Sequence, residues 1–303
     1  MKTLMLLAPL LATACAGSPA GSCALNRVAE LPLQVVGTVP LVTADINDRP
    51  ASLVLDIGSD TTVLNRAAAA RLNVTWDERS PVAAGGAGGP SSTFATTLPS
   101  LALGGDATPN VRTLIARAPA PPLDGVVGIN VLVGYELDLD VPRRQVVLYR
   151  ARPCPAALPP WTAPFTRLPV QQQRSGHLFV SEELDGQPLF GMLDTGATNI
   201  TVGLPSARDA GVTAVALRAD PASRTQSFDE GGLVVRQRRF RSLKIGNDVL
   251  DRPMLSVAAL PPYAGDMIIG GDYLATRRVW ISLVTGQVFV TTEQPDELQP
   301  RPR

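Results

Sequence analysis

The stretch VPLVTADINDRPASLVLDIGS (residues 39–59) has a counterpart in HLFVSEELDGQPLFGMLDTGA (residues 177–197), at a constant offset of 138 residues. The dipeptides Asn47-Asp48 and Asp185-Gly186 occupy the same place in the two copies. Both are typical of the two-residue loop of a β-hairpin. Each copy therefore predicts a strand, a tight turn and a second strand that is apolar until it reaches an aspartate.

A second pair of matching segments extends this repeat. GVVGINVL (residues 125–132) and MIIGGDYL (residues 267–274) are each followed by the pattern of a strand, a turn and a closing strand. The repeat predicts an all-β fold of two homologous lobes. We expect an N-terminal lobe at residues 23–150, a proline-rich linker at 151–164, a C-terminal lobe at 165–292 and a tail at 293–303. Short helices are expected at Asn65–Leu72 and Leu204–Ala210.

The composition excludes several classes of function. Among 303 residues, 27 Lys and Arg balance 27 Asp and Glu, so the net charge gives no reason to expect nucleic acid as a partner. The only histidine, His177, excludes a metal site built from several histidines; it is expected to be a strand or surface residue. The lysines, Lys2 and Lys244, do not follow a glycine-rich loop, which excludes a phosphate-binding P-loop. We therefore expect no metal and no organic cofactor.

The N-terminus predicts export. Met1–Ala14 has one positive charge and a short apolar run, which is typical of a secretory signal peptide and too short to cross a bilayer of about 30 Å. Residues 1–22 would hold this signal and the start of the mature chain. LATAC (residues 11–15) also resembles a bacterial lipobox with Cys15 as the lipidated residue, and ordinary cleavage nearby is the alternative. The protein is expected in the periplasm, on the outer membrane as a lipoprotein, or secreted. A lipid on Cys15 is the only membrane attachment expected.

Loss or lipidation of Cys15 leaves two cysteines, Cys23 and Cys154. An even pair in an oxidising compartment suggests a disulfide between them, with two unpaired thiols as the alternative. Neither cysteine has an obvious activating base, so catalysis by a thiol is not expected.

Each copy of the repeat ends in an aspartate, within LDIGS (residues 55–59) and LDTGA (residues 193–197). Together with VVG (residues 126–128) and IIG (residues 268–270), these motifs resemble the pepsin and retropepsin superfamily of aspartic peptidases. The fit is closest to bacterial two-lobe proteins with retropepsin-like repeats, and it covers both lobes. The resemblance implies an active cleft between the lobes, with VVG and IIG packed beneath the aspartate loops. It assigns Asp56 and Asp194 as the catalytic pair, supported by Gly58, Ser59, Thr195 and Gly196.

Two carboxyl groups that share one proton can hydrolyse a peptide bond without a metal, because one activates water and the other protonates the carbonyl oxygen. Ser59 is expected to hydrogen-bond the outer oxygen of Asp56 and to favour its ionised form. Ala197 has no hydroxyl for this role, so Asp194 is expected to carry the shared proton. The family usually has Thr or Ser at the position of Ile57, where a hydroxyl helps to lock the two loops together.

The glycine-rich segment AAGGAGGPSS (residues 83–92) stands where this family has a β-hairpin flap over the substrate, and a surface loop is the alternative. FDEGGL (residues 228–233) is the corresponding candidate in the C-terminal lobe, as a second flap or a hairpin turn. Asp60 matches a retroviral position that contacts the substrate main chain; a pair with Arg66 or a loop cap is the alternative. The flap glycines would be Gly85, Gly86, Gly88 and Gly89.

The sequence thus predicts an aspartic endopeptidase that acts on an extended peptide or protein substrate. A non-catalytic peptide-binding module that retains the fold is the alternative, and a secreted structural β domain with incidental aspartates is a third interpretation. Because both aspartates lie in one chain, we expect a monomer.

Overall fold

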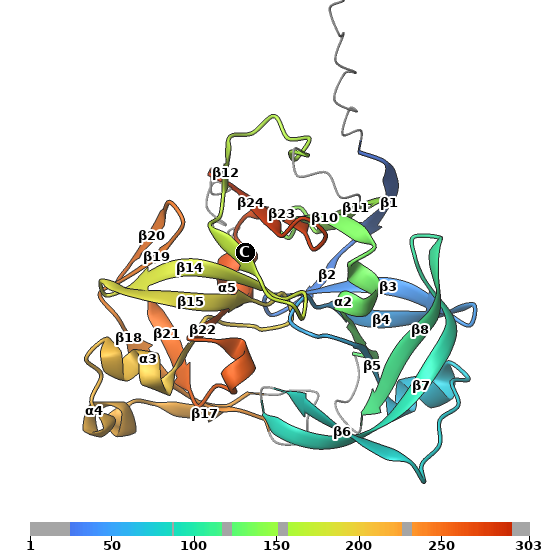
Figure 1. Cartoon of the computed structure of the whole chain (residues 1–303), viewed down its shortest axis with the longest axis horizontal. Coiled ribbons are helices and arrows are strands. Elements are labelled where there is room, and N and C mark those ends of the chain that lie inside the picture. The colour runs from blue at the N-terminus through green and yellow to red at the C-terminus, as the bar shows by residue number, and fades with distance from the viewer. Residues whose placement is uncertain (1–24, 87, 117–122, 151–156, 226–231, 293–303) are drawn as a thin grey trace, which may run out of the picture.

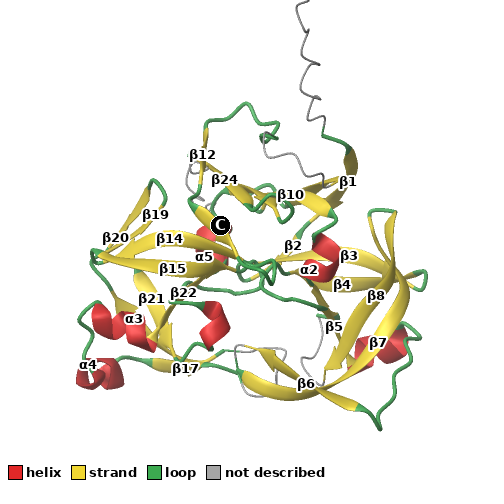
Figure 2. Cartoon of the chain, viewed as in Figure 1, coloured by secondary structure: helices red, strands yellow, loops and turns green. Residues whose placement is uncertain are grey.

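The computed structural model describes residues 25–86, 88–116, 123–150, 157–225 and 232–292. Three sheets form the molecule. Two belong to the individual lobes, and a six-stranded sheet takes three strands from each half of the chain (Figure 1). Strands dominate the described residues, and the helices are few and short (Figure 2). The fold is therefore all-β with two lobes, as the repeat predicts.

The six-stranded sheet joins the two lobes at the top of the view in Figure 1, in the order β1-β11-β10-β23-β24-β12. Its central pair is β10 and β23, one strand from each lobe, which run antiparallel from Glu136 opposite Ser282 to Asp140 opposite Arg278. The first three strands in this order come from before the linker, and the last three come from after it. In chain order, the six strands are β1 (Arg27–Pro32), β10 (Tyr135–Asp140), β11 (Gln145–Arg150), β12 (Phe165–Arg167), β23 (Arg278–Ser282) and β24 (Gln287–Thr291).

The sheet of the N-terminal lobe has the order β2-β3-β4-β9-β5-β8-β7-β6. The hairpin of β3 and β4 turns at Asn47 and Asp48, whose φ angles of 51° and 57° confirm the predicted tight turn. β9 pairs in parallel with β4, the strand that leads to Asp56. The strands are β2 (Gln34–Val36), β3 (Val39–Ile46), β4 (Arg49–Leu55), β5 (Thr62–Asn65), β6 (Pro81–Gly86), β7 (Gly89–Leu103), β8 (Asp106–Ala116) and β9 (Gly125–Val127).

The sheet of the C-terminal lobe repeats this plan. Its order is β17-β18-β21-β16-β22-β15-β14-β19-β20, with β13 paired to β14. The hairpin of β14 and β15 turns at Asp185 and Gly186, with φ angles of 52° and 89°. The strands are β13 (Val170–Gln172), β14 (Leu178–Leu184), β15 (Gln187–Leu193), β16 (Thr201–Gly203), β17 (Ala222–Arg224), β18 (Val234–Arg239), β19 (Ser242–Ile245), β20 (Asp248–Asp251), β21 (Met254–Ala258) and β22 (Met267–Ile269).

The two helices predicted from the sequence are present as α1 (Arg66–Arg71) and α3 (Leu204–Asp209). Asn65 begins α1, because its side chain accepts a hydrogen bond from the Ala68 N–H at 2.7 Å. None of the described helices has the length and apolar character that a membrane span needs. Four further helices were not predicted, since a turn or two is too short to show a helical period. They are α2 (Ile129–Leu132), α4 (Ala214–Ala219), α5 (Gly271–Leu274) and the 3₁₀ helix η1 (Pro262–Ala264).

A buried ion pair holds the two lobes together within the six-stranded sheet. Asp138 on β10 accepts two hydrogen bonds of 2.7 Å from the guanidinium of Arg278 on β23. The indole N–H of Trp161, which precedes β12, lies 3.1 Å from each oxygen of the same carboxylate. The side chain of Asp138 is fully buried, so its charge depends on these donors.

We expect Asp138→Ala to lower the free energy of unfolding by about 3 kcal/mol, because it leaves the Arg278 charge and the Trp161 N–H without their acceptor. Arg79→Ala is the matched control, since it breaks an exposed pair with Asp77 and should cost less than about 1 kcal/mol. Urea unfolding of both variants measures the difference. Equal losses in the two variants would contradict a special role for the buried pair.

Glu182 is a buried carboxyl group in the core of the C-terminal lobe. It lies on β14 on the same face as the core residue Val180. Neither of its carboxyl oxygens has a hydrogen-bond partner among the described residues. The carboxyl group lies against Gly191, where an added Cβ would be 2.5 Å from both oxygens. Burial, and next the negative charge of Asp266, raise the pKa of Glu182 well above its ordinary value. The equivalent position of the N-terminal lobe is the buried Ala44.

Folding raises the pKa of Glu182, so this group is neutral in both the folded and the unfolded protein below about pH 4. As the pH rises above this value, Glu182 ionises more easily in the unfolded chain, and the free energy of unfolding falls until the raised pKa is reached. We expect Glu182→Gln to raise the melting temperature at pH 7 by at least about 2 °C, the shift that ~1 kcal/mol produces in a domain of this size. The gain should shrink to near zero at pH 4. Calorimetry of both proteins at the two pH values tests this, and an equal gain at both would refute ionisation as the cause.

Candidate active site

The two aspartates of the repeat occupy equivalent places at the ends of β4 and β15. The N–H of Asp56 donates to the carbonyl of Val127 at 3.1 Å, and the N–H of Asp194 donates to the carbonyl of Ile269 at 3.0 Å. These carbonyls end β9 and β22, which pair in parallel with the strands that lead to the aspartates. The VVG and IIG segments therefore hold the aspartate loops in place by main-chain hydrogen bonds.

The loops bring the two carboxyl groups together across the lobe boundary. A Cβ added to Gly58 would lie 2.5 and 2.7 Å from the carboxyl oxygens of Asp194. A Cβ added to Gly196 would lie 2.5 and 2.8 Å from those of Asp56. Each glycine thus leaves the space that the carboxyl group of the opposite lobe fills, and the two carboxyl groups hydrogen-bond to each other.

The surroundings of the pair change its proton affinity. Burial is the main cause that raises the pKa of both carboxyl groups, and the negative charge of Asp194 raises that of Asp56 further, to well above its ordinary value. The pKa of Asp194 is raised as well, while the hydrogen bond from Asp56, the N–H groups of residues 196 and 197 and the charge of His177 act in the opposite direction. The pair therefore keeps one proton to a higher pH than an exposed carboxyl group does. The expectation that Asp194 carries this proton stays a prediction.

Ser59 supports the site differently from the prediction. Its hydroxyl donates to the carbonyl of Thr61 at 2.9 Å, so this proton does not go to the outer oxygen of Asp56. The loop stabilises Asp56 through main-chain donors instead: the Gly58 N–H lies 2.8 Å from Oδ1, and the Ser59 N–H contributes in the same direction. In the other loop, the N–H groups of residues 196 and 197 donate to Oδ1 of Asp194 at 2.8 and 3.1 Å.

Thr195 locks the two loops together from one side. Its hydroxyl donates to the carbonyl of Leu55 at 2.6 Å and accepts from the N–H of Ile57 at 3.0 Å. The side chains of Thr195 and Ile57 are both buried, and Ile57 has no hydroxyl to return the contact. The interlock is therefore present in one direction only, as the departure of Ile57 from the family pattern indicates.

Each loop has a further support behind it. The side-chain oxygen of Asn130 accepts from the Thr62 N–H at 2.8 Å. At the equivalent place in the C-terminal lobe, the carboxylate of Asp272 accepts from the Ile200 N–H at 2.8 Å. The motif LDTGA does not contain Asp272, and the contact of this residue with Ile200 depends on the position of α5 in the folded lobe.

His177 lies between the lobes and is buried, so the expectation of an ordinary strand or surface residue is wrong. Its Nε2 is 3.2 Å from the Gly58 carbonyl and 3.5 Å from Oδ1 of Asp60. Asp60 therefore faces His177, whereas Arg66 pairs with Glu78. The side chain of Asp60 is 67% exposed, which leaves it accessible to a substrate, and its role in binding stays a prediction.

The glycine-rich segment forms a hairpin in which Gly85 pairs with Pro90 and Gly86 pairs with Gly89. Gly88 lies in the turn between the two strands. Figure 1 shows β6 and β7 of this hairpin reaching along the bottom of the view from the N-terminal lobe. A hairpin is what a flap requires, and its closure over a substrate stays a prediction.

The second candidate flap falls largely on residues 226–231, outside the described residues. So do Cys15, Cys23 and Cys154, the signal segment at 1–22 and the tail at 293–303.

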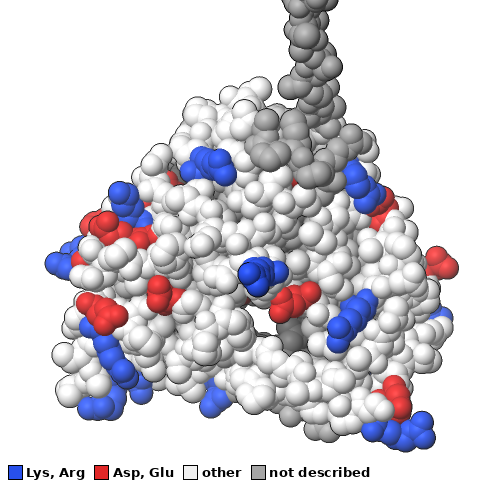
Figure 3. Space-filling model, viewed as in Figure 1, with Lys and Arg blue, Asp and Glu red and all other residues white. Residues whose placement is uncertain are grey.

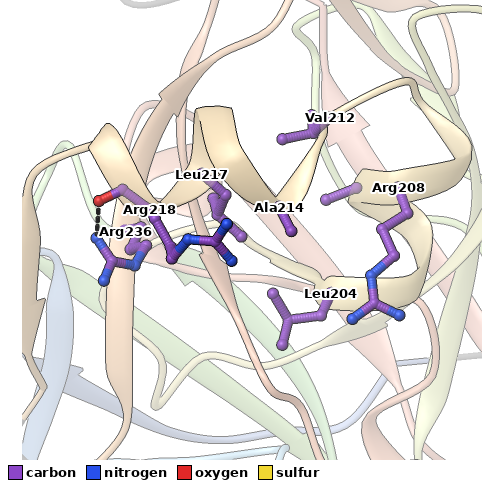
Figure 4. Close-up of a pocket in the computed structure, with 8 residues that line it drawn as sticks. Leu204, Arg208, Val212, Ala214, Leu217, Arg218 and Arg236 are labelled. Carbon is purple, nitrogen blue, oxygen red and sulfur yellow. Dashed lines mark hydrogen bonds between the residues drawn. The ribbon is translucent and has the colours of Figure 1, made fainter.

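A separate pocket of about 150 Å³ lies between α3, α4 and β18 in the C-terminal lobe (Figure 4). Apolar side chains and three arginines line it, and neither aspartate contributes to it. Within the described ranges, no group of three or more His, Cys, Asp and Glu side chains could hold a metal ion. The pocket is lined by Leu204, Ala207, Arg208, Val212, Ala214, Leu217, Arg218 and Arg236.

Comparisons with known proteins agree with the fold. Residues 42–136 match the family model described as aspartyl protease. Among solved structures, the aspartic proteinase from Irpex lacteus is 14% identical to this chain, with a TM-score of 0.54 over 87% of this chain and 97% of that one. At this level of identity the likeness shows the fold. No curated protein sequence matches the chain.

Thr195→Val tests the one-sided interlock. We expect it to lower the free energy of unfolding by about 1–3 kcal/mol, because it leaves the buried Ile57 N–H and Leu55 carbonyl without a partner. Thr96→Val is the matched control, since the Thr96 hydroxyl bonds the Thr75 carbonyl in an exposed position and its loss should cost less. Chemical unfolding measures both, and equal losses would show that the interlock adds no stability.

Proposed function

We propose that the chain is an aspartic endopeptidase that hydrolyses peptide bonds with water activated between Asp56 and Asp194; the match of residues 42–136 to the aspartyl protease family model and the likeness in fold to an aspartic proteinase support this. The observation that carries this proposal is the close approach of the two partly buried carboxyl groups, each in the space left by a glycine of the opposite loop. Two carboxyl groups that merely capped turns would not need this arrangement across two lobes.

The proposed reaction starts from a pair that holds one proton, which we place on Asp56 because a protonated His177 would favour the negative charge on Asp194. The ionised Asp194 takes a proton from a water molecule as it attacks the scissile carbonyl carbon, and Asp56 gives its proton to the carbonyl oxygen. In the second step, the acid formed on Asp194 protonates the leaving amine as the carbon–nitrogen bond breaks, and the hydroxyl of the tetrahedral species returns its proton to Asp56. The pair thus recovers its single proton, and neither step needs a metal.

The substrate would reach the pair from the space between the lobes. Figure 3 shows an opening near the middle of one face of the molecule, between the two lobes. An extended peptide in this opening would lie below the aspartate loops and against the hairpin of β6 and β7.

A single chain supplies both aspartates, which supports a monomeric enzyme. Export, attachment through Cys15 and a Cys23–Cys154 disulfide stay predictions.

A peptide-binding module without activity is the second candidate, and the one-sided interlock is the observation that favours it. With only Thr195 to lock the loops, the pair has fewer contacts that hold its geometry. The two candidates differ in one measurable way, since a module would bind peptides and leave them intact.

We expect Asp56→Asn and Asp194→Asn each to lower kcat/KM by at least about 100-fold, because each removes one partner of the acid–base pair. Asp45→Asn is the control, as Asp45 is an exposed carboxylate on β3 outside the cleft. Cleavage of a quenched-fluorescent peptide library, followed by kinetics on the best peptide, measures all four proteins.

Circular dichroism would show that the variants remain folded. Normal cleavage by either asparagine variant would contradict the assignment of the pair. Peptide binding by the unchanged protein without any cleavage would favour the binding module.

A further inference from the structure

His177 connects the start of the C-terminal lobe to the active-site loop of the N-terminal lobe. Its ring is buried, with Nε2 at 3.2 Å from the Gly58 carbonyl and Nδ1 at 3.0 Å from the Ser175 hydroxyl. Gly58 is the residue whose missing Cβ makes room for the carboxyl group of Asp194. A shift of the Gly58 loop would therefore change the distance between the two carboxyl groups.

The approximate two-fold relation of the lobes gives a second contact for comparison. Thr38 of the N-terminal lobe donates its hydroxyl to the Thr198 carbonyl in the loop that follows Asp194, at 2.6 Å. The position equivalent to His177 in that lobe is Val39, at the offset of 138 residues. Both lobes therefore touch the opposite active-site loop through a hydrogen bond, but only the contact at His177 can carry a charge.

The two hydrogen bonds of His177 are compatible with both protonation states. The neutral ring donates from Nε2 to the Gly58 carbonyl and accepts at Nδ1 from Ser175, while the charged ring donates from both nitrogens. The contact with the Gly58 carbonyl is therefore kept whether the ring is neutral or charged. The titratable groups that face His177 among the described residues are the largely exposed Asp60 and the aspartate pair.

We propose that His177 is a positioning residue for the aspartate pair: it fixes the Gly58 loop against the other lobe and, when protonated, favours the negative charge on Asp194. This proposal rests on the proposed function, since it concerns the same pair. The main-chain donors do not distinguish the aspartates, because two N–H groups of each loop favour its ionised form. A protonated His177 adds a positive charge that favours the ionised form of Asp194, and this makes the two halves of the site unequal.

The sign of the effect on activity follows. The active form holds one proton on the pair, so the acid limb of the pH profile reports the loss of the first of two protons. A protonated His177 stabilises the resulting negative charge and moves this limb to lower pH. This effect needs the charged ring, so a neutral His177 leaves the second proton loss unaffected. His177 thus extends activity toward acidic pH.

The test compares His177→Gln with Thr38→Val. Glutamine keeps an N–H donor for the Gly58 carbonyl and removes the charge, while Thr38→Val removes the uncharged contact between the lobes. We expect His177→Gln to move the acid limb of kcat/KM upward by at least about half a pH unit, which is about a threefold loss of activity on that side. The alkaline limb should stay in place. Thr38→Val should leave both limbs unchanged, whatever it does to the height of the profile.

A second readout does not depend on cleavage. In ¹³C NMR of the protein labelled at the aspartate carboxyl carbons, the signals of Asp56 and Asp194 can be assigned from their asparagine variants. The first apparent pKa of the pair should be higher in His177→Gln than in the unchanged protein and in Thr38→Val. An unchanged first step in His177→Gln, or an equal shift in Thr38→Val, would overturn the role of His177. Absence of cleavage in all proteins, with the NMR shift present, would overturn the proposed function and leave this inference standing.

Discussion

Two partly buried carboxyl groups that resist simultaneous ionisation lie against each other, and contacts from both lobes hold them there. Neither loop could reach this position with a larger residue at 58 or 196, because a Cβ would overlap the opposite carboxyl group. The strands β9 and β22 fix the main chain of the loops, and Thr195 ties one loop to the other. The proposed chemistry needs one ionised carboxyl group in the pair. Burial disfavours that charge and so raises the pKa of both groups, which means that the site is formed at a cost in stability.

The lobes stay in register because they share a sheet. The antiparallel pair of β10 and β23 crosses the lobe boundary with main-chain hydrogen bonds, and the Asp138–Arg278 pair adds a directional contact that only one register satisfies. Trp161 uses the same carboxylate, so the segment that leads into the second lobe is tied to the junction of both. An error of one residue in this sheet would displace the aspartate loops relative to each other.

Local signals in the sequence account for what could be predicted. The hairpin turns at residues 47–48 and 185–186, the helices α1 and α3 and the aspartate motifs are all encoded by neighbouring residues, and the repeat doubles each signal. Contacts across the lobe boundary have no such local signal. The lone histidine lies in the interface because of how the loops fold rather than because of its residue type. Within one loop, the hydroxyl of Ser59 has a choice of acceptors, and it bonds the Thr61 carbonyl rather than Asp56. The short helices α2, α4 and α5 also escape prediction, since their residues carry no helical period.

The duplicated lobes differ at the positions that carry charge or a hydroxyl. Threonine faces isoleucine in the interlock, His177 corresponds to Val39, and Glu182 corresponds to Ala44. A strictly symmetric pair would hold its proton equally on both carboxyl groups. In the proposed arrangement, a protonated His177 next to one loop would favour Asp194 as the base and Asp56 as the acid before any substrate binds. A single chain can keep such differences because each half has its own sequence, whereas a symmetric dimer must repeat every residue twice. Two unequal halves can therefore favour one acid–base assignment in the free protein, which two identical halves could do only after binding a substrate.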